Sequence, residues 1–212
     1  MENYNPASAV YLRDSSLPFW QNNVDAESIF EAFSHRPERA RTWLRHRNVS
    51  ETCSGFERAV MMHGHFEGGI LQNYIYRWTF TPGRKGDLAI VVPVLEGGGR
   101  LVDFVAMSRH DENAIWGCCT GVGRYVGEFS AARVAVHKTP LAWLLSGDGV
   151  LPLAKSFFPL LQFANNIVAR DGDHAWELAN QAFLYPAERL GLDVECAEQA
   201  AFDRISFDEA TA

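Results

Sequence analysis

The centre of the chain carries the pattern that most constrains its fold. Residues 88–95 (LAIVVPVL) are apolar at nearly every position, and residues 101–108 (LVDFVAMS) follow after the glycine run 97–99. A short, continuous apolar run is typical of a strand that is buried on both faces, and a glycine-rich link is typical of a hairpin turn. The two runs therefore predict an antiparallel pair of strands inside a covered sheet.

Three further segments have the character of strands. Residues 70–80 alternate aromatic and other side chains, and the short segments 114–119 (AIWGCC) and 132–137 (ARVAVH) are largely apolar. Short strands that follow one another through turns favour antiparallel pairing. We therefore predict an α+β fold whose core is a five-strand, mainly antiparallel sheet, with two N-terminal helices and a helical C-terminal third.

Start and stop signals predict helices before and after the strands in the sequence. Asp25 is a candidate N-cap for residues 26–34, and Pro37 is a favourable first residue for a helix over 37–47. After the sheet, Thr139 and Gly147 are candidate caps of one short helix. Two more helices are expected over 153–170, where Pro159 forms a kink, and over 174–184, where Asp173 is the cap.

The central sheet needs both helical regions as cover, so we predict a single domain over residues 1–212. Its expected parts are an N-terminal arm (1–24), a helical segment (25–55), the β-rich core (70–138), a second helical segment (139–191) and an acidic tail (192–212).

Charge is distributed unevenly along the chain. The formal net charge is −7, which excludes a protein with a uniformly basic surface for nucleic acid. From Asp171 to the end, ten acidic residues face only two arginines, a charge of −8, so the first 170 residues sum to +1. Within them, His35 to Arg47 holds five arginines and one glutamate. A local contact with nucleic acid is therefore still allowed.

The predicted helix over 37–47 is the first candidate binding surface. Guanidinium groups bind phosphate, and an aromatic ring can stack on a base. The arginines, however, spread around the helix at 100° per residue, so a solvated helix or an internal partner for the acidic tail is the alternative interpretation. The candidate binding residues are Arg36, Arg39, Arg41, Trp43, Arg45 and Arg47.

Asp103 is the first candidate catalytic residue. It lies among apolar residues of a predicted strand, where an unpaired carboxylate is costly. A cross-strand arginine, Arg133 or Arg77, would explain it structurally, and a position at the mouth of a cleft would make it catalytic. His110 is a second catalytic candidate in the same region of the sequence.

His63 and His65 are the candidate metal ligands. In an extended segment, residues i and i+2 share a face, and the third ligand would come from Asp103 or His110. Two histidines in a surface loop are the alternative interpretation, so we predict no cofactor.

His137 and Lys138 lie at a predicted junction between a strand and a helix. Free N–H groups at a helix N-terminus beside these side chains would form an anion-binding pocket, and a simple helix cap is the alternative. The N-terminal residues show no secretory pattern and no segment reaches the length of a membrane span, so we expect a cytoplasmic protein without a membrane partner.

One part of the chain resembles a known group of proteins. LVDFVA, Trp116, Gly121 and Gly127, followed by VHKTPLAWLLSGDGV, resemble uncharacterised proteobacterial proteins that are associated with phages and other mobile elements. The resemblance covers residues 101–149, about a quarter of the chain. It implies a genomic setting and no reaction.

These observations lead to one first hypothesis and two alternatives. We expect a non-enzymatic accessory protein of phage or mobile-element origin that binds nucleic acid or a protein partner through the arginine-rich helix. The first alternative is a small metal-dependent hydrolase or nuclease that uses Asp103 with His63, His65 and His110. The second is an oligomeric structural protein, because the aromatic content of 12% is high for a single core.

Overall fold

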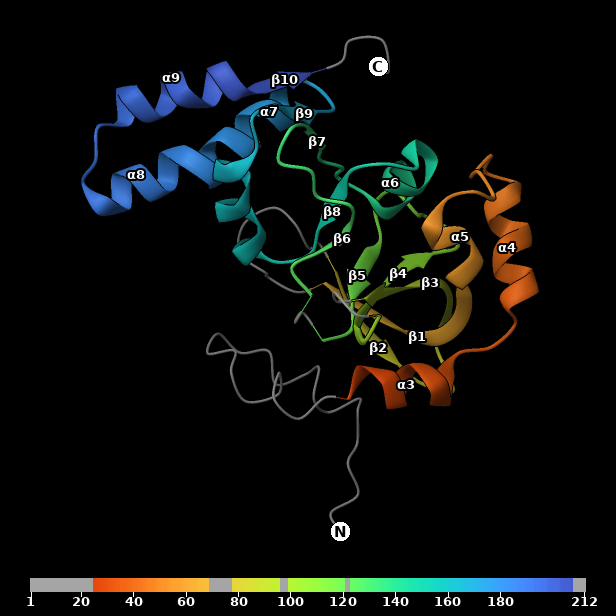
Figure 1. The fold of residues 1–212 in the computed structure, drawn as a ribbon. Helices are drawn as coiled ribbons and strands as arrows, with labels where there is room; N and C mark the ends of the chain where they lie inside the picture. Colours follow the sequence, from red (N-terminus) through yellow and green to blue (C-terminus); the bar gives the residue numbers. More distant parts are fainter. Residues whose placement is uncertain (1–24, 69–77, 96–98, 121–122, 208–212) are drawn as a thin grey trace. The chain divides into compact units, whose positions relative to one another are not determined.

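The computed structural model describes residues 25–68, 78–95, 99–120 and 123–207. Contacts within the chain group it into two compact units (Figure 1). Unit 1 consists of Met1–Gly123 and Thr139–Gly147, and unit 2 consists of Arg124–Lys138 and Asp148–Ala212. The chain passes between the two units three times. The single domain that we expect over residues 1–212 stays a prediction.

Unit 1 is built around a closed five-strand barrel. Its strands are β1 (Val60–Gly68), β2 (Trp78–Pro82), β3 (Asp87–Leu95), β4 (Leu101–Ser108) and β5 (Trp116–Cys118). They neighbour one another in the order β1-β2-β5-β4-β3, and every pair is antiparallel except β2 with β5. The predicted α+β class with a five-strand, mainly antiparallel sheet is confirmed.

The strands that close the barrel differ in part from those expected. Strand β1 covers the segment around His63 and His65, for which we predicted no strand, whereas residues 134–135 pair in unit 2. The outer face of β1 carries the two histidines, so the segment lacks the clear apolar alternation that indicates a strand. Of the predicted strand 70–80, residues 70–77 lie outside the described residues, as do Gly97 and Gly98 of the predicted turn.

Phenylalanine, methionine and aliphatic side chains fill the barrel. Phe80 and Phe104 meet edge to face with their ring centroids 6.4 Å apart, and Met62 and Ile29 belong to the same buried cluster. Gly117 allows β5 to lie close to β2, because a Cβ there would be 2.1 Å from the carbonyl oxygen of Trp78. The one parallel pair of the barrel therefore depends on a residue without a side chain.

The described residues of unit 1 form four helices, and local signals account for three of them. They are α3 (Ala26–Phe33), α4 (Pro37–Arg45), α5 (Ser54–Arg58) and α6 (Pro140–Ser146). The carboxylate of Asp25 accepts a hydrogen bond from the N–H of Glu27, which confirms the predicted cap of α3. The Thr139 hydroxyl accepts from the N–H of Ala142, and Gly147 ends α6 with a φ of 73°.

In its described residues, unit 2 combines two small sheets. Strands β7 (Val134–Ala135), β9 (Ile167–Ala169) and β10 (Ile205–Phe207) are parallel in the order β10-β9-β7, and β6 (Tyr125–Gly127) is antiparallel to β8 (Val150–Pro152). A 3₁₀ helix, η1 (Lys155–Phe163), precedes β9, where we predicted one kinked α-helix over 153–170. Pro159 lies inside η1, and a proline lacks the N–H that an α-helix requires.

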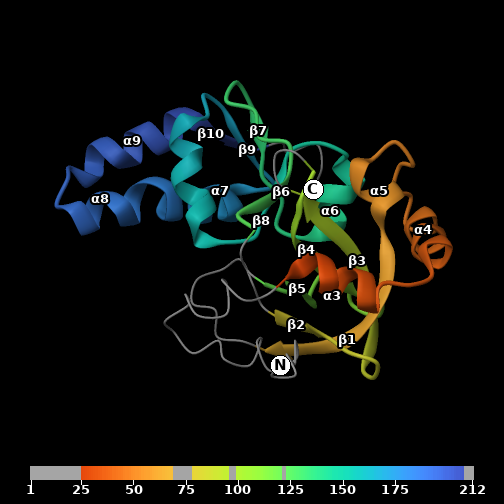
Figure 2. The ribbon, with the colours of Figure 1, turned by 60° about the horizontal axis from the view of Figure 1, so that its bottom comes forward.

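The C-terminal part of unit 2 is helical, as predicted, and extends into the expected acidic tail. It contains α7 (Gly172–Ala179), η2 (Asn180–Leu184), α8 (Tyr185–Leu190) and α9 (Val194–Arg204). Asp171, and not Asp173, caps α7 by accepting from the N–H of His174 at 2.8 Å. Figures 1 and 2 show α8 and α9 as neighbouring helices joined by a short turn. In the described part of the chain, no helix is both long and apolar enough for a membrane span.

Candidate nucleic-acid interface

Helix α4 sorts its charged side chains onto two sides. Ala40 and Leu44 are buried and fix the inner face of the helix. At 100° per residue, Arg41 and Arg45 then fall on one side of this face, and Arg39 and Trp43 fall on the other. Arg36 precedes the first turn, with a left-handed φ of 50°. The expectation that the arginines spread around the helix is therefore met, and the two sides must be considered separately.

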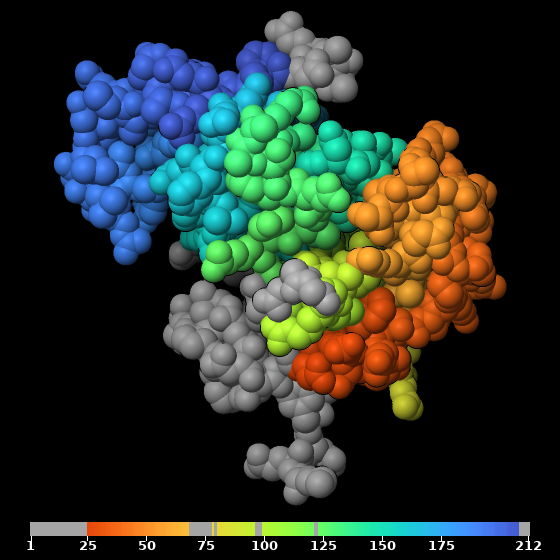
Figure 3. All heavy atoms as spheres, viewed as in Figure 1, coloured from red at the N-terminus to blue at the C-terminus, as the bar shows by residue number. Residues whose placement is uncertain are grey.

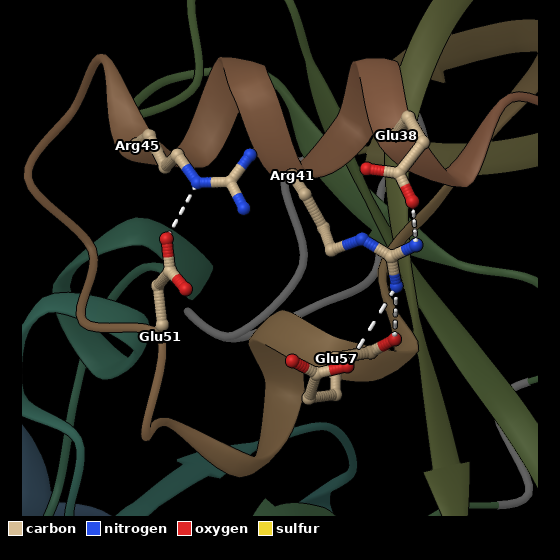
Figure 4. A network of polar contacts seen from close by, with 5 residues as sticks. All are labelled: Glu38, Arg41, Arg45, Glu51 and Glu57. Carbon is tan, nitrogen blue, oxygen red and sulfur yellow. Dashed lines mark hydrogen bonds and ion pairs between the residues drawn. The ribbon is translucent and has the colours of Figure 1, made fainter.

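The first side is neutralised by carboxylates (Figure 4). Arg41 forms an ion pair with Glu38 and donates to the carbonyl oxygen of Glu57 at 3.1 Å. Arg45 forms an ion pair with Glu51, with Nε 2.6 Å from the carboxylate oxygen. The space-filling view of Figure 3 shows α4 and α5 in adjoining orange shades, and both contribute to this network. These carboxylates come from α4, α5 and their connecting loop, so they, and not the acidic tail, are the partners of Arg41 and Arg45.

Arg47 is also engaged, just beyond the end of α4. Its Nε donates to the carboxylate of Glu112, and this hydrogen bond lowers the pKa of Glu112. Its guanidinium carbon lies 3.5 Å from the ring centroid of Trp43. The side chain of Arg47 therefore links the end of α4 to the loop that follows β4, which is a structural role.

Arg36 and Arg39 are different. Both side chains are exposed, and neither forms an ion pair or a side-chain hydrogen bond within the described residues. Trp43, four residues after Arg39, is partly exposed on the same side of α4. We call Arg36, Arg39 and Trp43 the open side of α4. It combines two available guanidinium groups with one aromatic ring.

Asp103 is fully buried and is held by backbone groups. Its Oδ1 accepts from the N–H groups of Phe104 at 2.8 Å, Cys119 at 3.1 Å and Thr120 at 2.8 Å. Backbone N–H donors are a structural means of burying a carboxyl group, and the sequence does not reveal them. Of the arginines expected beside Asp103, Arg77 lies outside the described residues.

His110 does not share a site with Asp103. Asp103 lies near the start of β4 and Ser108 at its end, about 17 Å apart at the rise of a β-strand. His110 lies beyond Ser108 and is exposed, and its N–H donates to the Ser108 hydroxyl at 3.2 Å. The two catalytic candidates therefore lie toward opposite ends of the barrel.

His63 and His65 lie on the outer face of β1, as the spacing requires. The ring of His63 stacks on that of His35, with centroids 5.4 Å apart, and His65 is exposed. Asp103 pairs with Val94 of β3 and His63 with Leu88, so they are separated by about 20 Å along that strand. The described residues contain no group of three His, Cys, Asp or Glu that could hold a metal ion. The metal-dependent alternative stays a prediction without an assembled site.

His137 and Lys138, the predicted anion-binding residues, follow β7 in unit 2. The Nε2 of His137 donates to the carbonyl oxygen of Asp148 at 3.1 Å, and burial lowers the pKa of this histidine. The ammonium group of Lys138 lies 3.0 Å from a carboxylate oxygen of Glu177. Both side chains therefore have partners within unit 2, and an anion would have to compete with Glu177 for Lys138.

His174 is a buried titratable residue that the sequence did not indicate. Its side chain is 4% exposed, and its Nδ1 accepts from the N–H of Arg170 at 3.1 Å. Burial, together with the nearby charge of Lys138, lowers the pKa of His174 to about 3. The imidazole is therefore neutral at neutral pH, with its proton on Nε2. The sequence around His174 mixes polar and apolar residues, so it does not indicate that this histidine is buried.

Comparison with known proteins gives no family assignment. No family model and no curated protein matches the chain. Among solved structures, a DnaG primase catalytic domain bound to ssDNA is similar with a TM-score of 0.49, 16% identity, and coverage of 76% of this chain and 65% of that chain. The Escherichia coli primase catalytic core gives 0.46, 15%, 76% and 64%, and a DNA primase domain from Pseudomonas aeruginosa gives 0.48, 13%, 74% and 65%.

The chain thus spans less than two thirds of the length of each of these primase chains. Similarity at this level does not transfer a function, because the same fold supports unrelated activities and function belongs to individual sites. The candidate nucleic-acid contact in this chain is therefore judged from its own side chains, and it is the open side of α4.

Proposed function

We propose that this chain is a nucleic-acid-binding accessory protein whose contact surface is the open side of α4. One observation supports this above all others. Arg36 and Arg39 are exposed and unpaired in the described structure, whereas Arg41, Arg45 and Arg47 each contact a carboxylate. An origin in a phage or mobile element, inferred from residues 101–149, is part of the same proposal.

The contact is with the phosphate backbone. Two guanidinium groups displace about two condensed counterions from the nucleic acid, so the logarithm of the affinity falls with the logarithm of salt concentration at a slope of about −2. The guanidinium group of Arg47 already stacks on the ring of Trp43, so we assign Trp43 a structural role in this surface and not the stacking of a base. The net charge of −7 opposes binding elsewhere on the chain. We therefore expect weak binding that is strongly salt-dependent and independent of sequence.

The test measures fluorescence anisotropy of labelled single-stranded and duplex DNA at about 50 mM salt, with the chain and its variant R36E/R39E. We expect the variant to lose affinity by at least about tenfold. The matched control is K155E/R189E, which changes the net charge by the same amount at two exposed residues of unit 2. Unchanged binding by R36E/R39E, or an equal loss in the control, would overturn the proposal.

A protein partner at the same surface is the other outcome of this experiment. If the unchanged chain binds neither form of DNA nor an RNA oligonucleotide at low salt, the open side of α4 does not bind nucleic acid. The arginine-rich helix would then serve a protein contact, and the proposed function would be wrong.

A further inference from the structure

The turn between α8 and α9 displays a group of aliphatic side chains to solvent. Leu190, Leu192 and Val194 expose 71%, 60% and 37% of their surface. They lie within five consecutive residues, so they form one local cluster, which we call the apolar tip. Single exposed leucines are common on protein surfaces, but neighbouring ones that share a tight turn indicate a contact site.

The backbone holds the apolar tip in a defined shape. Gly191 adopts a left-handed φ of 64° and ends α8, and the N–H of Leu192 donates to the carbonyl oxygen of Ala187 at 2.9 Å. Asp193 then caps α9 by accepting from the N–H of Glu195 at 3.0 Å. Residues in such a turn lose little further conformational entropy on binding, and this favours affinity.

Most of the surface of helix α9 is exposed in the part of the chain that the structure describes. Ala201 is its only buried residue, and Phe202 is 70% exposed. The helix packs on η2, α7 and α8 through a narrow stripe of alanines. Within the described residues, its remaining surface is therefore available to another molecule, and Val194 belongs both to the apolar tip and to the first turn of α9.

Carboxylates surround this apolar surface. Glu188, Glu195 and Glu198 are exposed and form no ion pair in the part of the chain that the structure describes. Residues 185–204 contain five acidic residues and two arginines. One of these arginines, Arg204, donates to the carbonyl oxygen of Gln162 and lies over the ring of Phe183.

Charge decides between the candidate occupants of this surface. A second copy of the chain would bring the same carboxylates into contact, and like charges across an interface are unfavourable. Nucleic acid and anionic lipid are repelled for the same reason. A basic protein segment has the opposite charge, and an amphipathic helix would bury its leucines against the apolar tip.

From this complementarity we infer that the apolar tip and the outer face of α9 form a docking site for a basic, amphipathic segment of another protein. The apolar side chains supply the affinity, and the carboxylates supply orientation and a salt-dependent association rate. This surface is in unit 2 and is independent of the proposed nucleic-acid contact on α4.

The test uses a synthetic 18-residue peptide with leucines at helical spacing and lysines elsewhere, titrated into the full-length chain by calorimetry at low and at moderate salt. The control peptides replace every lysine with glutamate, or scramble the leucines so that no apolar face forms. We expect only the first peptide to bind, and we expect its affinity to fall as salt rises. Equal binding of the first and the scrambled peptide would overturn the inference, and so would its failure to bind.

Variants of the chain locate the contact. L190Q/L192Q should weaken binding of the basic peptide by about tenfold or more, and E188Q/E195Q should reduce its salt dependence. The control L145Q changes an exposed leucine of α6, in unit 1, and should bind as before. Circular dichroism verifies that each variant is folded. Equal effects of L190Q/L192Q and L145Q would overturn the inference, as would a dimer in sedimentation that L190Q/L192Q abolishes.

Discussion

The two units of this chain differ in how they treat charge, both in the interior and at the surface. Unit 1 buries the carboxyl group of Asp103 among three backbone N–H donors, whereas unit 2 buries His174 as a neutral imidazole. At the surface, most arginines of α4 are paired, whereas carboxylates of α8 and α9 lack ion-pair partners within the described residues.

This difference shows that the formal charge of a segment does not describe its binding surface. By composition, the segment His35–Arg47 is the most basic part of the chain, yet ion pairs leave two of its five arginines available. In unit 2, Asp171 and Glu177 are ion-paired, whereas Glu188, Glu195 and Glu198 form no ion pair within the described residues, so the charge of these three is displayed. What a charged surface binds depends on pairing, and pairing depends on the fold.

The largest effect is expected at Asp103. The variant D103A leaves three buried N–H groups without their acceptor and should lower the free energy of unfolding by about 3 kcal/mol. D103N keeps an oxygen acceptor and should cost about half as much. Urea denaturation of both variants measures this. If D103A lowered the free energy of unfolding by less than about 1 kcal/mol, the hydrogen bonds of Asp103 would not stabilise the fold as this structure indicates.

A smaller, pH-dependent effect is expected at His174. Its pKa is lowered to about 3, below the ordinary value of 6.5, so the unfolded chain binds a proton that the folded chain does not. Stability therefore falls as the pH drops below 6.5, by about 2 kcal/mol between pH 7 and pH 5. His137, whose pKa burial also lowers, acts in the same direction.

The variant H174N isolates this contribution. Its amide oxygen can replace Nδ1 as the acceptor for the N–H of Arg170, and it does not titrate. Urea denaturation at pH 7 and pH 5 should show about 2 kcal/mol less pH dependence for H174N than for the unchanged chain. The matched control is H65N, which changes an exposed histidine of unit 1 and leaves His174 in place. Identical profiles for H174N and the unchanged chain would contradict the account of unit 2.

The smallest effect is expected at the ion pair between Arg47 and Glu112. Both side chains are partly buried, and the pKa of Glu112 is lowered by the hydrogen bond from Arg47. E112Q should lower the free energy of unfolding by about 0.5–1 kcal/mol at neutral pH. The difference should disappear as the pH falls and Glu112 is protonated in the unchanged chain. A destabilisation that does not diminish as the pH falls below 4.5 would show that the carboxylate charge is not what matters.

Local signals in the sequence predicted the features that depend on a few neighbouring residues. The caps at Asp25 and Thr139, the helix start at Pro37 and the turn at Gly147 follow from side-chain chemistry and backbone preference. The two strands β3 and β4 were also predictable from neighbouring residues alone, because nearly all of their side chains are apolar and a short apolar run indicates a buried strand.

Features that depend on distant residues were not predictable in this way. Strand β1 joins both β2 and β3 to close the barrel, and its histidines obscure the pattern. Two of the N–H donors to Asp103, those of Cys119 and Thr120, come from the end of another strand, and the partner of Arg47 is 65 residues away. The sequence could therefore list the arginines of α4 but could not state which of them are available.

The availability of those arginines is the central claim, and one comparison within α4 tests it most directly. The variants R36Q/R39Q and R41Q/R45Q remove the same charge from the same helix, one pair from the open side and one from the paired side. Anisotropy with labelled single-stranded DNA, over a series of salt concentrations, measures the affinity and its salt slope. We predict that R36Q/R39Q reduces the slope by about 2, whereas R41Q/R45Q leaves it nearly unchanged. Equal slopes for the two variants, or the larger loss in R41Q/R45Q, would contradict the account.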